Sequence, residues 1–148
     1  MRAVVQRVAG ASVSVDGREV ARIGKGLLVL LGVAAGDGTE ETAWTARKTA
    51  EMRVFADGEG KMNLSVADIG GQILVVSQFT LLADLRQGRR PSFTLAAPPS
   101  EGEKLYLEYV DQVRLRSNCR VCTGVFGADM QVGIENDGPV TFVLDSPG

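Results

Sequence analysis

Histidine is absent from this sequence of 148 residues, and its absence excludes a large part of catalytic chemistry. A Ser-His-Asp triad, a Cys-His pair and a histidine-based metal site all need an imidazole, the side chain that titrates nearest neutral pH. Any reaction catalysed by this chain must therefore use hydroxyls, carboxylates, backbone groups or the substrate itself.

Cysteine is scarce, with one pair in the sequence Cys119-Arg120-Val121-Cys122. Such a pair can form a redox site or half of a zinc site, but no second pair and no histidine completes a zinc shell. The segment also continues as a predicted strand, on which residues three apart point to opposite faces. We expect two reduced, structural cysteines and no metal.

Long apolar segments are lacking too. The longest, residues 26–35, has ten residues, whereas a membrane-spanning helix needs about 20. Near the N-terminus, Gln6 and Arg7 interrupt the apolar residues before a signal-peptide core can form. We therefore expect a cytoplasmic protein with no membrane contact.

The length suits one compact domain, so we predict a single domain over residues 1–148. The net charge of -2 argues against nonspecific coating of nucleic acid. Twelve of the sixteen basic residues are arginine, which binds phosphate through a forked set of donors. Codon bias in a GC-rich genome explains that preference equally well, and only clustering separates the two explanations.

The hydrophobic pattern predicts an α+β fold, with mainly antiparallel sheets in a barrel-like core and two main helices. Asp16-Gly17 indicates a tight hairpin turn. The predicted strands cover residues 2–8, 11–15, 18–23, 26–33, 73–77, 79–82, 120–126, 130–135 and 140–144.

Two segments have helical periodicity. The first covers residues 39–55, where Asp37 or Thr39 can cap the helix and small residues form one face. The second begins after Pro98-Pro99, where Ser100 and Glu103 match a capping box. Its apolar face is predicted to contain Tyr106, Tyr109, Val110 and Val113. Glycine-rich turns elsewhere lack the residues of a phosphate-binding loop, and we predict no cofactor.

Two polar segments are candidate sites. Ser77-Gln78-Phe79-Thr80 follows a predicted buried strand, so its side chains and N–H groups lie at the end of a rigid element. Thr80 is a potential nucleophile that lacks a neighbouring base, and hydroxyls that satisfy a strand end explain the segment equally well. In residues 85–92, Arg86, Arg89 and Arg90 cluster in a predicted loop, which favours phosphate contact or an ordinary solvated turn.

A third segment, Asn136-Asp137-Gly138-Pro139, predicts a turn. The missing side chain of Gly138 permits close approach of the backbone to another group. A cis bond occurs before about 5–6% of prolines, so the sequence leaves the isomer at Pro139 open.

Together, Ser77-Gln78-Phe79-Thr80-Leu81 and the segment from Asn136 to Thr141 resemble the two signature motifs of the D-aminoacyl-tRNA deacylase family. The similarity extends in order along the chain, through residues 1–8, 60–63, 88–93 and 126–130. Leu82 and Leu85 depart from the family pattern, in which we expect Tyr and Thr, and put details of pocket shape or tRNA contact in question. A related animal family that removes L-alanine carries different signature motifs.

The resemblance implies a homodimer that binds the acceptor end of aminoacyl-tRNA. Gly138 and a cis Pro139 of each subunit would reach into the other subunit's pocket, where their carbonyls would block an L side chain and admit a D one. Glycine, which has no side chain, would not be excluded. The resemblance also implies that Arg7 braces this turn and that Phe126 and Met130 form the pocket wall.

The implied reaction is hydrolysis of the ester bond of D-aminoacyl-tRNA, assisted by the tRNA 2′-OH. Ser77, Gln78, Phe79 and Thr80 would form the catalytic segment, with backbone N–H groups near Phe79 and Thr80 stabilising the oxyanion. Thr80 as an acyl-accepting nucleophile is an alternative. A noncatalytic RNA-binding protein that uses the clustered arginines is another, and a fragment of a synthetase editing domain is a third.

Overall fold

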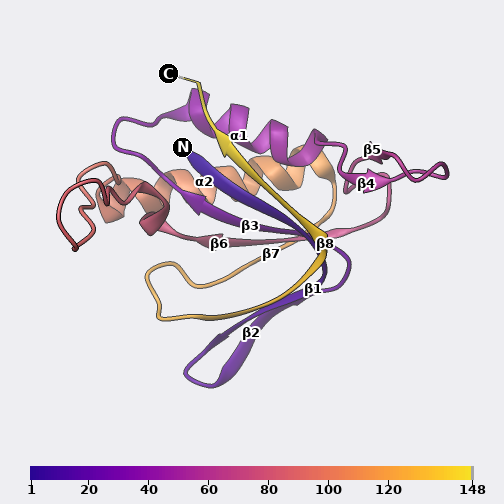
Figure 1. Cartoon of the computed structure of the whole chain (residues 1–148), viewed down its shortest axis with the longest axis horizontal. Helices are drawn as coiled ribbons and strands as arrows, with labels where there is room; N and C mark the ends of the chain where they lie inside the picture. Colours follow the sequence, from indigo (N-terminus) through magenta and orange to yellow (C-terminus); the bar gives the residue numbers. More distant parts are fainter. Residues whose placement is uncertain (148) are drawn as a thin grey trace.

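The computed structural model describes residues 1–147, so the predicted domain limit at Gly148 lies outside the described residues. In Figure 1, α1 and α2 lie together on one side of a curved sheet, and β2 and the loop between β7 and β8 lie on the other. Within residues 1–147, neither helix is both long enough and apolar enough to cross a membrane. The elements in chain order are β1 (Arg2–Val15), β2 (Arg18–Ile23), β3 (Gly26–Gly32), α1 (Thr39–Glu51), β4 (Phe55–Ala56), β5 (Met62–Leu64), β6 (Gln72–Ser77), the 3-10 helix η1 (Phe79–Leu82), α2 (Pro99–Ser117), β7 (Arg120–Thr123) and β8 (Gln131–Asp145).

The long strand β1 organises the sheet. It runs without a break where the sequence predicted two strands. One edge pairs antiparallel with β8 along almost its whole length, while the other pairs antiparallel with β3 and then with β2. The predicted hairpin turn is confirmed, because Asp16 and Gly17 both have positive φ, as a two-residue turn of this kind requires.

Two other pairings are parallel, β3 with β6 and β6 with β7. Parallel neighbours need a crossover, which α1 provides for the first pair and α2 for the second. The sheet is therefore mixed, a departure from the predicted mainly antiparallel arrangement, although the α+β class and barrel-like core are confirmed. Alternation of apolar residues identifies strands but says nothing of the direction in which they pair.

The sheet curls towards a barrel because β2 approaches β6 and β7. Nη1 of Arg120 donates to the backbone oxygen of Arg22 at 3.2 Å, and Oε1 of Gln72 accepts from the Gly24 N–H at 3.0 Å. The curl encloses an inner apolar cluster. Its buried members are Val8, Ala11, Val13, Ile23, Leu28, Leu74 and Val76.

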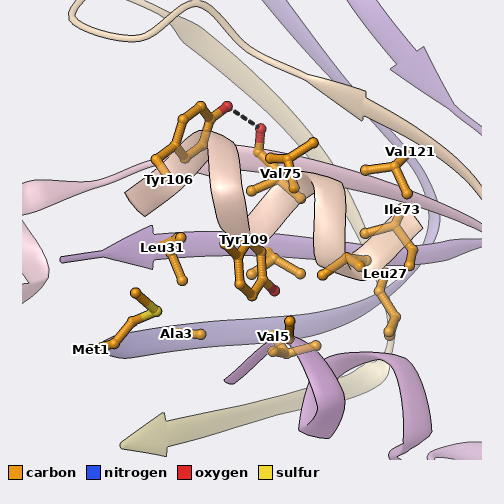
Figure 2. Packing of buried hydrophobic residues seen from close by; sticks show 14 of the residues in the cluster. Met1, Ala3, Val5, Leu27, Leu31, Ile73, Val75, Tyr106, Tyr109 and Val121 are labelled. Atoms are coloured by element: carbon orange, nitrogen blue, oxygen red, sulfur yellow. Dashed lines mark hydrogen bonds between the residues drawn. The ribbon is translucent and has the colours of Figure 1, made fainter. Parts of the chain in front are cut away.

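The opposite face of the sheet packs under the helices. Leu27 and Leu31 of β3 and Ile73 and Val75 of β6 face this side, and Figure 2 shows them on the side of the sheet where α2 packs. The apolar face predicted for α2 is confirmed, since Tyr106, Tyr109, Val110 and Val113 are all buried. The hydroxyl of Tyr106 donates to the Val75 carbonyl at 3.2 Å (Figure 2).

Both predicted helix caps are wrong. The N-cap of α1 is Gly38. Asp37 does not cap the helix, since its carboxylate accepts from the Ala34 N–H at 2.7 Å. The N-cap of α2 is Pro98, which has no side-chain capping hydrogen bond. Ser100 lies inside the first turn and is therefore not the cap residue. Helix α1 also ends at Glu51, four residues before the predicted end, and Phe55 enters β4.

Candidate active site

The segment after β6 forms a 3-10 helix, η1, where the sequence predicted a strand. Gly32 explains this difference, because a Cβ there would collide with the side chain of Leu82 and lie 3.0 Å from the Gln78 carbonyl oxygen. The chain can therefore fold closely over the end of β3. The N–H of Gln78 donates to the carbonyl of Leu31 at 2.8 Å and fixes the start of η1.

A cavity of about 710 Å³ lies beside η1. Its lining comes from residues 76–79, from residues 93–94 and 96–99 before α2, and from residues 126–130 between β7 and β8, together with Val33, Gly102 and Val132. Five residues that the sequence singled out line this cavity, namely Ser77, Gln78, Phe79, Phe126 and Met130. The fold thus brings together segments that are far apart in the sequence.

The segment before α2 was missed by sequence reasoning. Phe93 belongs to the cavity wall, and its ring meets that of Phe79 edge-on with centroids 5.0 Å apart. Both rings are partly exposed to solvent. The available signal was the sequence Ala96-Ala97-Pro98-Pro99, whose small residues and prolines favour irregular chain at the edge of a sheet.

Backbone donors are concentrated at the start of η1. The first hydrogen bond of this turn runs from the Leu81 N–H to the Gln78 carbonyl, at 3.2 Å. The N–H groups of Phe79 and Thr80 precede that bond and stay outside the ladder. They can therefore donate to an oxyanion at the cavity mouth.

The hydroxyl of Thr80 is already engaged within the segment. It accepts a hydrogen bond from the side-chain amide of Gln78, and the residue is not part of the cavity lining. Among the described residues that line the cavity, only Asp129 carries a titratable side chain, and it is exposed. The geometry therefore favours backbone donors over a side-chain nucleophile.

Gly138 and Pro139 lie in a wide bulge of β8. The predicted turn does not end the strand. Instead, residues 137–140 bulge out opposite Arg7, between the pairs Asn136–Val8 and Thr141–Gln6. The Gly138–Pro139 peptide is cis, and both residues are exposed.

Side chains close this bulge and tie it to the sheet. Oδ1 of Asn136 accepts from the Val140 N–H at 3.0 Å. Nε of Arg7 donates to the Asp137 carbonyl at 3.1 Å, while its Nη1 donates to the Val54 carbonyl at 2.8 Å. Neither Arg7 nor the bulge is part of the cavity wall within one chain.

The predicted arginine cluster occupies a closed loop. Asp84 and Ser92 exchange two backbone hydrogen bonds, of 2.8 and 2.9 Å, which join the ends of the loop. The side chain of Arg86 donates to both carboxylate oxygens of Asp84, at 2.9 and 2.8 Å, and lowers the pKa of that carboxyl to about 2. Arg89 and Arg90 are exposed on the same loop.

The two cysteines lie on opposite sides of the sheet, as predicted. Cys119 packs against the cluster under the helices, and Cys122 packs against the inner cluster. Both are free thiols. Their side chains therefore belong to two separate apolar layers.

Comparisons with known proteins agree along the whole chain. The family model described as D-Tyr-tRNA(Tyr) deacylase matches residues 4–145. A D-aminoacyl-tRNA deacylase of Syntrophotalea carbinolica is 62% identical, over 99% of this chain and 97% of that protein. One of Geobacter sulfurreducens is 55% identical, over 99% of this chain and 95% of that protein.

Solved structures extend the comparison to three dimensions. A c-Myc DNA unwinding element binding protein superposes with a TM-score of 0.93 at 45% identity, with both chains fully covered. A probable eukaryotic D-amino acid tRNA deacylase shares the fold, with a TM-score of 0.80 at 20% identity over 97% of each chain. The chain belongs to the D-Tyr-tRNA(Tyr) deacylase family, a family of hydrolases.

Proposed function

We propose that this protein hydrolyses the ester bond of D-aminoacyl-tRNA and so edits wrongly charged tRNA in the cytoplasm. One observation carries the proposal: a cavity lined by Ser77, Gln78 and Phe79 lies at the start of η1, where the first two backbone N–H groups stay outside the turn's hydrogen-bond ladder. An ester carbonyl placed at this mouth would develop negative charge next to those donors. Stabilisation of that charge favours the tetrahedral intermediate.

The tRNA itself would assist the attacking water through the 2′-OH of its terminal ribose. This part of the proposal is supported by the cavity lining, in which Asp129 is the titratable side chain. The protein would then contribute orientation and donors, which account for large rate enhancements without a side-chain base. One substitution separates the two mechanisms: Asp129→Asn should retain activity if the 2′-OH assists the water, whereas a large loss of activity would identify Asp129 as a general base.

Chiral selection would come from a second copy of the chain. The bulge with Gly138 and Pro139 is exposed and hydrogen-bonded to Arg7 through the Asp137 carbonyl, yet it does not line the cavity of its own chain. In a homodimer the bulge of one subunit would close the other subunit's cavity and oppose an L side chain. Glycyl-tRNA(Ala) would pass the same filter, because glycine has no side chain to exclude.

The acceptor end of the tRNA would lie along the loop between Asp84 and Ser92. Arg89 and Arg90 are exposed there and offer forked donors to phosphates. Arg86 is less available to phosphates, because its guanidinium is paired with Asp84.

The decisive experiment compares hydrolysis of D-tyrosyl-tRNA and L-tyrosyl-tRNA by the purified protein. We expect rapid release of D-tyrosine and little release of L-tyrosine, and equal rates would refute the proposal. A substrate ending in 2′-deoxyadenosine should be hydrolysed far more slowly, so full activity on it would refute assistance by the 2′-OH. Sedimentation should show a dimer.

A second function is favoured by the similarity to a structure named as a DNA-binding protein. In that case the loop between Asp84 and Ser92 would bind nucleic acid through its arginines, without catalysis. Gly138→Ala should impair turnover if the protein is a hydrolase, and Thr80→Ala should do so if the Thr80 hydroxyl, through its bond with the Gln78 amide, helps to shape η1. If they leave turnover unchanged while loss of Arg89 and Arg90 abolishes RNA binding, the binding function is the correct one.

A further inference from the structure

Arg2 connects three elements at the end of the sheet that carries η1. On β1 it lies between Gly32 of β3 and Asp145 of β8, in a cross-strand row whose members share one face of the sheet. Its Nε donates to Oδ1 of Asp145 at 2.7 Å, and its Nη1 donates to the carbonyl of Leu81 in η1 at 3.1 Å. A single guanidinium therefore links β8 to η1.

At Gly32, the remaining member of this row, η1 occupies the space that a side chain would take. Gly32 has no side chain, and a Cβ there would collide with Leu82 and lie 3.2 Å from Cβ of Leu81. The missing side chain admits η1 to the sheet, beside the guanidinium of Arg2. Packing and hydrogen bonding thus act on the same turn from adjacent strands.

Besides the packing over Gly32, the hydrogen bond from the Gln78 N–H to Leu31 and the ring contact of Phe79 with Phe93, few interactions hold η1 in place. None of its four residues is buried, and a 3-10 turn of this length has weak hydrogen-bond geometry. A charge-assisted bond to its last carbonyls is among the stronger interactions that a side chain can supply. It also places a positive charge at the end of the turn where the backbone dipole is negative.

We propose that Arg2, oriented by Asp145, is a positioning residue that holds the N–H groups of Phe79 and Thr80 in their reactive orientation. The inference rests on the proposed deacylase function. Arg2 is not part of the cavity lining, so it acts through η1 and not on the substrate. Small displacements of groups that stabilise a transition state reduce turnover more than binding.

The test uses full-length Arg2→Met, Arg2→Lys and Asp145→Asn, with Arg47→Met as a control on the exposed face of α1. We expect Arg2→Met to lower kcat on D-tyrosyl-tRNA by about tenfold or more, with KM changed by less than about twofold. Arg2→Lys should recover part of the loss because it keeps one donor, and Asp145→Asn should show a smaller decrease. Arg47→Met should match the wild type.

Amide hydrogen exchange of Leu81 and Ala83, whose N–H groups donate to the Gln78 and Thr80 carbonyls and so report on the integrity of η1, gives a second measurement that needs no turnover. Exchange at these two amides should accelerate in Arg2→Met and not in Arg47→Met. Unchanged exchange, or a kcat loss explained entirely by a smaller folded fraction, would overturn the inference. A wild-type protein that fails to hydrolyse D-tyrosyl-tRNA would instead refute the proposed function, and the exchange result would still decide whether Arg2 positions η1.

Discussion

The guanidinium of Arg7 donates from Nη1 to the backbone carbonyl of Val54 at 2.8 Å. The same side chain donates from Nε to the carbonyl of Asp137, so it ties the bulge of β8 to the chain just beyond α1. These bonds restrain a segment that is exposed on its outer side. The position of Gly138 and Pro139 therefore depends on a residue in another strand.

Arg7→Met should weaken chiral selection. Hydrogen bonds from a charged group contribute about 1.5–3 kcal/mol, so their loss should let the bulge move. We expect the ratio of D-tyrosyl-tRNA to L-tyrosyl-tRNA hydrolysis to fall by about tenfold or more, measured as kcat/KM for each substrate. A ratio equal to that of the wild type would show that the bulge needs no support from Arg7.

Gly138→Ala should impair the enzyme through local strain. Gly138 has a φ of +134°, and a Cβ there would lie 2.7 Å from Cγ2 of Val140. Such a conformation costs an L residue about 1–3 kcal/mol, and the bulge should shift to relieve it. Activity and the thermal unfolding midpoint are measured together.

Gly17→Ala is the matched control for that variant. Gly17 also has a positive φ, of +78°, but a Cβ there would have no atom within 4 Å. It should cost about 1–2 kcal/mol of stability, with normal deacylation. If Gly17→Ala lost as much activity as Gly138→Ala, the effect at Gly138 would be one of general stability.

The three clustered arginines should contribute unequally to RNA binding. Replacement of Arg89 or Arg90 by methionine should reduce the slope of log K against log salt by about 0.7–0.9 in absolute value, because one phosphate contact is lost. Replacement of Arg86 should leave the slope unchanged, since Asp84 already neutralises its charge. Fluorescence anisotropy with an uncharged tRNA over a range of NaCl concentrations measures these slopes.

The difference in salt dependence between the Arg86 variant and the Arg89 and Arg90 variants should persist across the physiological pH range. The side chain of Arg86, followed by its backbone N–H, lowers the pKa of Asp84 from 3.8 to about 2. A lowered pKa in the folded state stabilises the loop above the unfolded pKa, and this contribution is lost only as the pH falls towards about 2. Equal slopes for all three variants at pH 7 would contradict the assignment.

Thr49 and Tyr109 should respond asymmetrically to removal of their shared hydrogen bond, which is 2.8 Å long. In Tyr109→Phe the Thr49 hydroxyl still donates to the Thr45 carbonyl, so we expect a loss of about 1 kcal/mol. In Thr49→Val the buried Tyr109 hydroxyl loses its partner, and the loss should be about 1–3 kcal/mol. Urea unfolding of both variants compares them, and a larger loss for Tyr109→Phe would contradict this explanation.

Local sequence patterns predicted the structure correctly where the regular geometry of one helix, strand or turn decides which side chains are buried. The buried face of α2 followed from the spacing of Tyr106, Tyr109 and Val110, because a helix repeats its burial every three to four residues. The hairpin at Asp16-Gly17 followed from the backbone conformations that its residues tolerate. The opposite orientations of Cys119 and Cys122 followed from strand geometry.

The candidate site was predicted only in part. Ser77, Gln78 and Phe79 were singled out by their position after a buried strand, but the 3-10 conformation of η1 was not. That conformation depends on Gly32, which is distant in sequence and leaves space for the turn. Phe93 was missed because the local signal, the prolines and small residues of 96–99, indicates irregular chain and does not show that a nearby ring lines a cavity.

By itself, the sequence determined the two main helices and most of the long strands, the buried face of α2, and the family to which the motifs point. Only the tertiary structure decided that two of the strand pairs are parallel and that β8 bulges opposite Arg7. It also separated Gly138 and Pro139 from the cavity beside η1. The physical reason is that burial and backbone preference are encoded locally, whereas pairing partners and cavities are set by contacts between residues far apart in the chain.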